Sequence, residues 1–88
     1  MNHYALFEEF DGRRSLPVDM NHPKQVIIAE TILSAIQSFS DKNHLRLVDY
    51  DDLPDHAIRA YCRKKSLFRR DEQYIYYIRR MPEDVEKI

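Results

Sequence analysis

Between positions 22 and 40 apolar side chains recur at helical spacing, which constrains the fold more than any other feature of this chain. On a wheel of 100° per residue they fill an arc of about 160–180°. Asn21 can cap such a helix, and Pro23 falls in the first turn, where its missing N–H does no harm. We therefore expect a helix over 22–40. Its expected core residues are Ile32, Ile36 and Phe39.

The wide arc leaves two explanations open. The helix could be central, covered by a sheet and by a second helix, or part of the arc could form a dimer interface. With 88 residues the chain is long enough for one domain and too short for two.

Asp11-Gly12 is a strong turn signal, because a type I′ turn needs positive φ at both central residues. The pattern around it predicts a hairpin with strands over 4–10 and 13–18. The competing interpretation is a short helix over 4–10, because two glutamates there favour helix.

The C-terminal half predicts a strand over 45–50, a helix over 53–65 and a second hairpin with strands over 66–69 and 73–80. Asp52 can cap the helix. The run from Tyr74 to Ile78 is apolar on both faces, which suits a central strand or one covered by a partner.

These elements predict the α+β class, with a small, mainly antiparallel sheet and two helices packed on one of its faces. We expect one domain over 1–80 and a mobile acidic tail over 81–88. The order helix, strand, helix, hairpin over 22–80 resembles a winged-helix module in architecture. It differs at 45–52, where a strand-like pattern replaces the first helix of the recognition pair, so we assign no family and transfer no recognition residues.

Charge is unevenly distributed along the chain, although the net charge is only −1. Residues 1–58 carry ten acidic and five basic side chains, net −5, whereas 59–80 carry eight basic and two acidic ones, net +6. The sequence has no apolar stretch long enough to span a bilayer and no secretory signal pattern, so we expect a cytoplasmic protein that does not enter membranes.

The sequence carries no recognisable catalytic or cofactor site, and we expect a protein that is not an enzyme. One cysteine excludes a disulfide framework, and the four histidines lack metal-ligand spacing. Asp52 and His56 suit a helix cap with a local ion pair better than an acid/base pair. Cys62 suits a buried thiol better than a nucleophile. We expect no cofactor, no metal and no small-molecule substrate.

The basic segment supports the leading hypothesis, a non-catalytic binding module that contacts nucleic-acid phosphates, with tyrosines that could stack on bases. The candidate residues are Arg59, Arg63, Lys64, Arg69, Arg70, Tyr74, Tyr76 and Arg79. A less specific explanation is that these charges only solvate the surface. The alternative function is a protein-interaction module (a small subunit, an inhibitor or a regulatory homodimer) that uses the wide helix face or the Tyr-rich strand.

Overall fold

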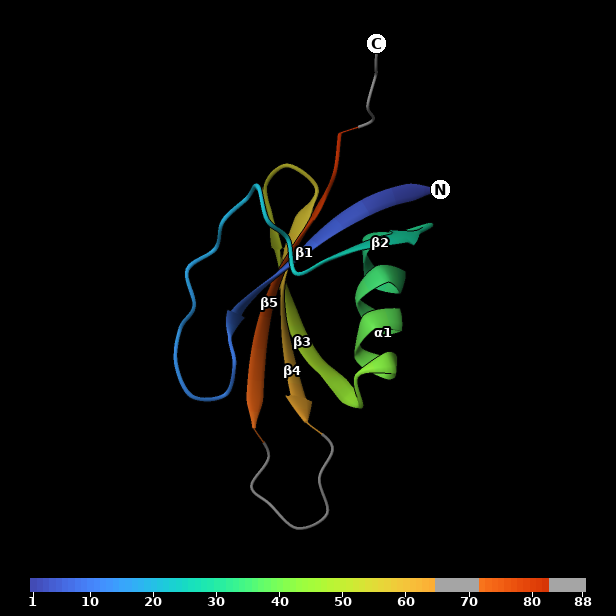
Figure 1. Ribbon diagram of the computed structural model, residues 1–88. Helices are drawn as coiled ribbons and strands as arrows, with labels where there is room; N and C mark the ends of the chain where they lie inside the picture. The colour runs from blue at the N-terminus through green and yellow to red at the C-terminus, as the bar shows by residue number, and fades with distance from the viewer. Residues whose placement is uncertain (65–71, 83–88) are drawn as a thin grey trace.

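A computed structural model describes residues 1–64 and 72–82 of the chain. In this part the chain forms five strands and one helix (Figure 1). In chain order they are β1 (Asn2–Phe10), β2 (Gln25–Ala29), α1 (Ile32–Lys42), β3 (Leu45–Leu53), β4 (Ala57–Lys64) and β5 (Gln73–Arg80).

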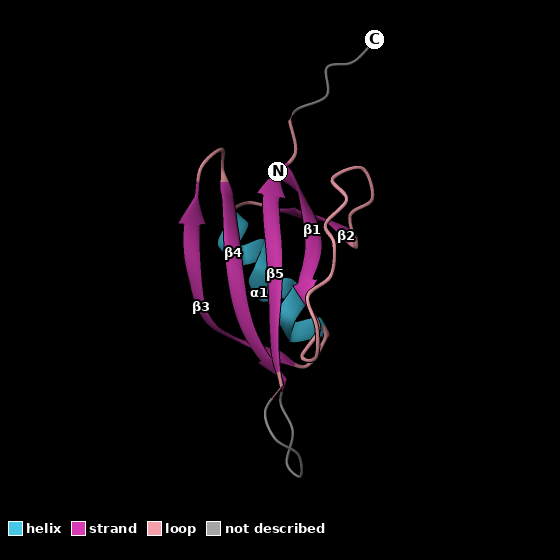
Figure 2. Cartoon of the chain, turned by 90° about the vertical axis from the view of Figure 1, so that its left-hand side faces the viewer, coloured by secondary structure: helices cyan, strands magenta, loops and turns pink. Residues whose placement is uncertain are grey.

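The five strands form one antiparallel sheet in the order β2-β1-β5-β4-β3, so β5 is central and β2 and β3 are the edges. The helix α1 lies across one face of the sheet, and Figure 2 views the sheet from the opposite side, with α1 behind the strands. We call the first the helix face and the second the open face. The loop 11–24 lies over the β1 end of the open face, where Phe7 is buried.

The expected helix over 22–40 is wrong in its first half. Residues Gln25–Ala29 form β2, and the helix begins only at Ile32. Three consecutive β-branched residues, Val26 to Ile28, favour a strand. The helix starts where Thr31 caps it: its side chain accepts a hydrogen bond from the Ser34 N–H, and the Ser34 side chain accepts one from the Thr31 N–H.

The expected second helix over 53–65 is also wrong, and in the described residues one helix, not two, packs on the sheet. Residues Ala57–Lys64 form β4. The segment before it makes a tight turn, in which Asp55 and His56 have positive φ of 65° and 57°. Asp and His adopt this region more readily than most residues, but they are weaker turn signals than Asn-Gly. The turn was therefore mistaken for a helix start.

The N-terminal hairpin is correct in its first strand and in the position of its turn. Gly12 has φ of 92°, a conformation that suits glycine. The expected second strand, 13–18, is wrong: beyond an isolated bridge from Phe10 to Ser15 the chain leaves the sheet, and β2 takes the place beside β1.

The strands predicted over 45–50 and 73–80 are confirmed, the first extended to Leu53 and the second as the central strand β5. The strand predicted over 66–69 and residues 83–88 of the tail lie outside the described residues. With a strand where the second helix was expected, the winged-helix resemblance does not hold.

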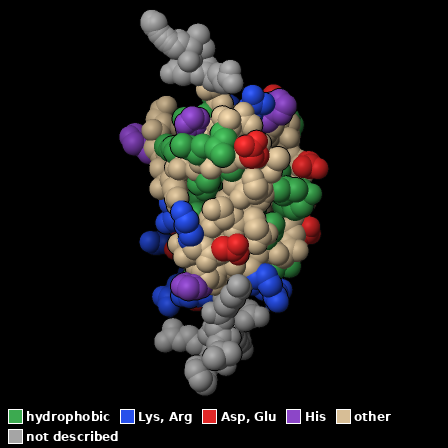
Figure 3. Space-filling model, turned by 90° about the vertical axis from the view of Figure 1, so that its right-hand side faces the viewer, with side chains coloured by type: hydrophobic (Ala, Val, Ile, Leu, Met, Phe, Trp, Pro, Cys, Tyr) green, Lys and Arg blue, Asp and Glu red, His purple; other side chains and the backbone are tan. Residues whose placement is uncertain are grey.

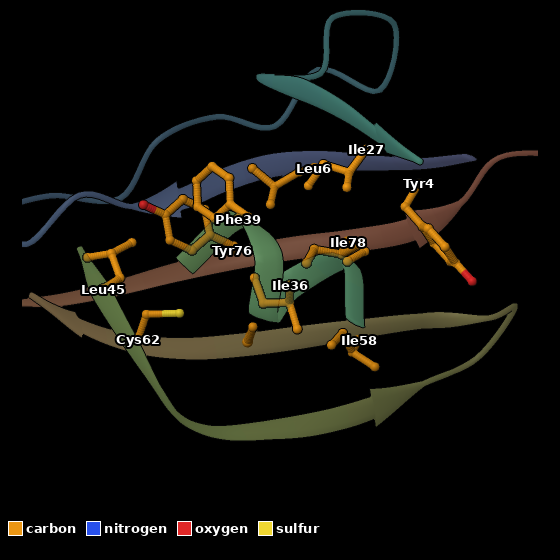
Figure 4. Packing of buried hydrophobic residues seen from close by; sticks show 12 residues of the cluster. Tyr4, Leu6, Ile27, Ile36, Phe39, Leu45, Ile58, Cys62, Tyr76 and Ile78 are labelled. Carbon is orange, nitrogen blue, oxygen red and sulfur yellow. The ribbon is translucent and has the colours of Figure 1, made fainter. Parts of the chain in front are cut away.

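The core lies between α1 and the helix face. Figure 4 shows Ile36 and Phe39 of α1 among side chains of the sheet, including Tyr76 and Ile78 of β5. The Phe39 and Tyr76 rings meet edge to face, with centroids 4.9 Å apart. On β4, alternate residues face this core, and Cys62 among them is fully buried. The core therefore rests on alternate residues of the strands and on one stripe of α1.

The two sheet edges differ in character. The edge strand β3 has a register irregularity between Leu47 and Asp49, which leaves Val48 without an opposite residue, and it carries three aspartates. Bulges and charges of this kind protect an edge from pairing with another strand. The edge strand β2 is short and has neither a charge nor a bulge.

Replacing Ile36 by Ala should lower the free energy of unfolding by about 2–5 kcal/mol, because Ile36 is fully buried and the surrounding side chains close such a cavity only in part. Leu33, one turn earlier and 40% exposed, is the matched control, and Leu33→Ala should change stability by less than about 1 kcal/mol. Denaturant unfolding measures both. Equal losses for the two variants would contradict the packing of α1 described above.

Candidate functional site: the open face of the sheet

The open face presents a grid of side chains from β3, β4 and β5, positioned by alternation along each strand. Its rows follow from the register of the three strands. In order across the sheet they are Arg79–Ala57–Leu53, Tyr77–Arg59–Asp51, Ile75–Tyr61–Asp49 and Gln73–Arg63–Arg46. The middle of the grid holds Tyr77, Ile75 and Tyr61 beside Arg59, and the other charged side chains lie around them.

Arg59 links the centre of the open face to β1. Its Nε donates to Glu9 Oε1 at 2.7 Å, and its Nη2 lies 3.4 Å from Glu9 Oε2. This two-pronged pair raises the pKa of Arg59 through the hydrogen bond and the negative charge of Glu9. The guanidinium is therefore already partly neutralised by a carboxylate.

The Tyr61 hydroxyl donates to Asp51 Oδ2 at 2.7 Å, on the β3 side of the grid. That hydrogen bond raises the pKa of Tyr61, because it stabilises the protonated phenol. Arg46 and Arg63 lie directly opposite each other at one end of the grid. The face thus holds four arginines and three carboxylates, counting Glu9, and its net charge is close to zero.

The residues predicted to contact nucleic acid fall into three groups. Arg59, Arg63 and Arg79 share the open face, as expected for one surface. Lys64, Tyr74 and Tyr76 lie on the helix face. Lys64 pairs with Leu45 and Tyr74 pairs with Cys62, and both partners are buried on that face. Arg69 and Arg70 lie outside the described residues.

The two candidate stacking tyrosines belong to the core side. Tyr76 is 3% exposed against Phe39, so it has no face free for a base. Tyr74 packs against the core cluster, and its hydroxyl donates to Glu72 at 3.1 Å. On the helix side of the molecule, positive and negative side chains are interspersed and form no continuous basic field (Figure 3).

Several residues of the open face are not among the residues expected from the sequence. Arg46, Tyr61, Tyr77 and Asp51 were not candidates. For Tyr61 the reason is that 53–65 was interpreted as a helix, and for the other three it is that no strand was expected at β4 to place them on one face. The signal that could have found them is the period-two spacing of Arg59, Tyr61 and Arg63, which places all three on one face once β4 is a strand.

A cavity of about 490 Å³ lies on the helix face, between the start of α1 and the adjoining strand ends. Glu30, Asp52, His56 and Arg80 contribute charged or ionisable groups to its wall. Within the described part of the chain no hydrogen bond joins Asp52 to His56. The two side chains therefore lack the contact that a general acid/base pair needs. The mixed charges favour no single class of ligand.

Cys62 is fully buried on the helix face, and burial raises the pKa of its thiol to about 11. A protonated, enclosed thiol is a poor nucleophile. Within residues 1–64 and 72–82, no three His, Cys, Asp or Glu side chains gather where they could hold a metal ion. In the same ranges no helix has the length and apolar character that crossing a membrane requires.

Comparisons with protein-family models, with curated proteins and with solved structures find no match to this chain.

Cys62 should react with a thiol reagent at pH 8 at least about a hundredfold more slowly in the folded chain than in denaturant, because its pKa lies about two units higher in the fold. The unfolded thiol ionises first, so this group lowers stability as pH rises from about 9 to about 11. Labelling kinetics measure the ratio on the single cysteine. Equal rates in both states would contradict its burial.

Proposed function

We propose that the chain is a protein-interaction module whose open face binds a protein partner. The observation that carries the proposal is the composition of this face: Tyr61, Tyr77 and Ile75 at its centre, with arginines and aspartates at its margin. Tyrosine and arginine are enriched at the energetically dominant positions of protein interfaces, and a charged rim selects the partner.

Rigidity supports the same function. An unbroken ladder joins β4 to β5, and β3 pairs with β4 on both sides of the irregularity at Val48. The Phe7 and Tyr77 rings also pack, with centroids 5.9 Å apart. A surface held in place by a sheet loses little conformational entropy when a partner docks. The near-neutral charge of the face suits a partner with mixed charges of its own.

Nucleic-acid binding is the second candidate, and the shared placement of Arg59, Arg63 and Arg79 favours it. Glu9, Asp49 and Asp51 lie on the same face and repel phosphates. Because binding to a polyanion depends on net positive charge, the protein partner is the better-supported occupant.

Tyr61→Ala and Arg46→Glu should each reduce capture of the partner about tenfold or more, because both side chains belong to the open face. Tyr50→Ala and Lys42→Glu are matched controls on exposed residues outside this face, and they should leave capture unchanged. Quantitative mass spectrometry of cross-linked partners, compared between wild type and the four variants, makes the measurement.

Equal capture by wild type and the two open-face variants would refute the proposal. A parallel anisotropy titration with single-stranded DNA and RNA at about 50 mM salt tests the second candidate. Oligonucleotide binding that weakens with salt and is abolished by Arg46→Glu would replace a protein partner with a nucleic acid.

A further inference from the structure

We propose that the free edge of β2 pairs with β2 of a second copy of this chain, forming a two-fold dimer with one continuous sheet. The inference concerns the opposite edge from β3 and does not rest on the proposed function. Val26 and Ile28, which lie on the same side of the sheet as the open face, are 44% and 58% exposed. Ile27 and Ala29 extend the core cluster on the other side, so β2 is apolar on both faces.

Two residues of β2 direct their backbone N–H and C=O groups towards the free edge, as pairing with another strand requires. The Met81 N–H donates to the His3 carbonyl, so odd-numbered residues of β1 direct their backbone groups towards β5 and even-numbered ones towards β2. Tyr4 and Ile27 therefore direct their backbone N–H and C=O groups at each other across the β1–β2 ladder. It follows that Val26 and Ile28 direct their N–H and C=O groups outwards, at the free edge.

One antiparallel register satisfies side chains and backbone together. With the two-fold axis at Ile27, Val26 lies opposite Ile28 of the second copy, and Gln25 lies opposite Ala29. Lys24 and Glu30 lie just beyond the two ends of β2, and the Lys24 N–H donates to the Leu6 carbonyl of its own chain. The same register therefore brings only their side chains together, Lys24 of one copy beside Glu30 of the second. Apolar residues thus face apolar residues, and a cation faces an anion.

Other registers lose this match. Moving the axis to Ile28 places Val26 opposite Glu30, and moving it to Val26 places Ile28 opposite Lys24. The edge strand β3 is unsuited to pairing with its own copy, because it carries Asp49, Asp51 and Asp52 beside a bulge. Charge complementarity and edge character therefore both select β2, and a second copy as its occupant.

Sedimentation velocity of the full chain over a wide concentration range tests the proposal. Wild type should dimerise as concentration rises, and Val26→Lys and Ile28→Lys should each raise the dimer dissociation constant at least about tenfold. Val48→Lys is the matched control, since Val48 is 49% exposed on the other edge. It should leave the dissociation constant unchanged, and thermal melts verify that each variant folds.

A charge exchange tests the register. Lys24→Glu and Glu30→Lys should each weaken the dimer by placing like charges opposite one another, and the double variant should restore it. Lys24 also lies 3.7 Å from Glu8 of its own chain. A loss caused only by that intrachain pair would not be rescued by Glu30→Lys, so rescue identifies the contact between copies.

A wild-type chain that stays monomeric at every concentration would overturn the proposal, as would a dimer insensitive to both lysine variants of β2. A dimer that dissociates only with Val48→Lys would assign the interface to β3 and would equally overturn it. A monomer whose β2 edge binds a strand of another protein would show that the occupant is not a second copy.

Discussion

The packing of α1 on the helix face is the interaction on which the other elements depend. Ile36 and Phe39 cover the central strand β5 at Tyr76 and Ile78, and this contact is the centre of the core cluster. The 11-residue helix α1 shields only one side of the five-stranded sheet. On the open face the loop 11–24 covers the β1 end, and the side chains of β3, β4 and β5 form the surface elsewhere.

Much of the strand content could be predicted from local pattern. The run over 73–80 is apolar on both faces and is the central strand, and the position of the first turn followed from Asp11-Gly12. The helix over 22–40 failed because Val26 to Ala29 are four consecutive apolar residues that fit either period. The sequence signal for the start of the helix is the capping box of Thr31 and Ser34. It is weak because Ser34 stands at the third helical position, where this motif usually has Glu or Gln.

The candidate site was harder to predict, because it depends on which strand face the helix covers. Ala57 and Tyr61 lie on one side of β4, while Ile58 and Cys62 lie on the other. Interpreted as a helix, these four residues form one stripe and conceal the alternation. Likewise Tyr76 and Tyr77 are equally suited to either face from their sequence alone. Tertiary packing made the first a core residue and left the second on the open face.

The irregular, acidic edge at β3 limits how far strands of this chain can stack side by side. A sheet with two receptive edges can add molecules without end and build a fibre. Here Val48 interrupts the ladder, and neighbouring aspartates repel their own copies, so addition stops at that boundary. The dimer that we propose through β2 would therefore not grow further, because two-fold pairing uses both β2 edges and leaves only the protected β3 edges exposed.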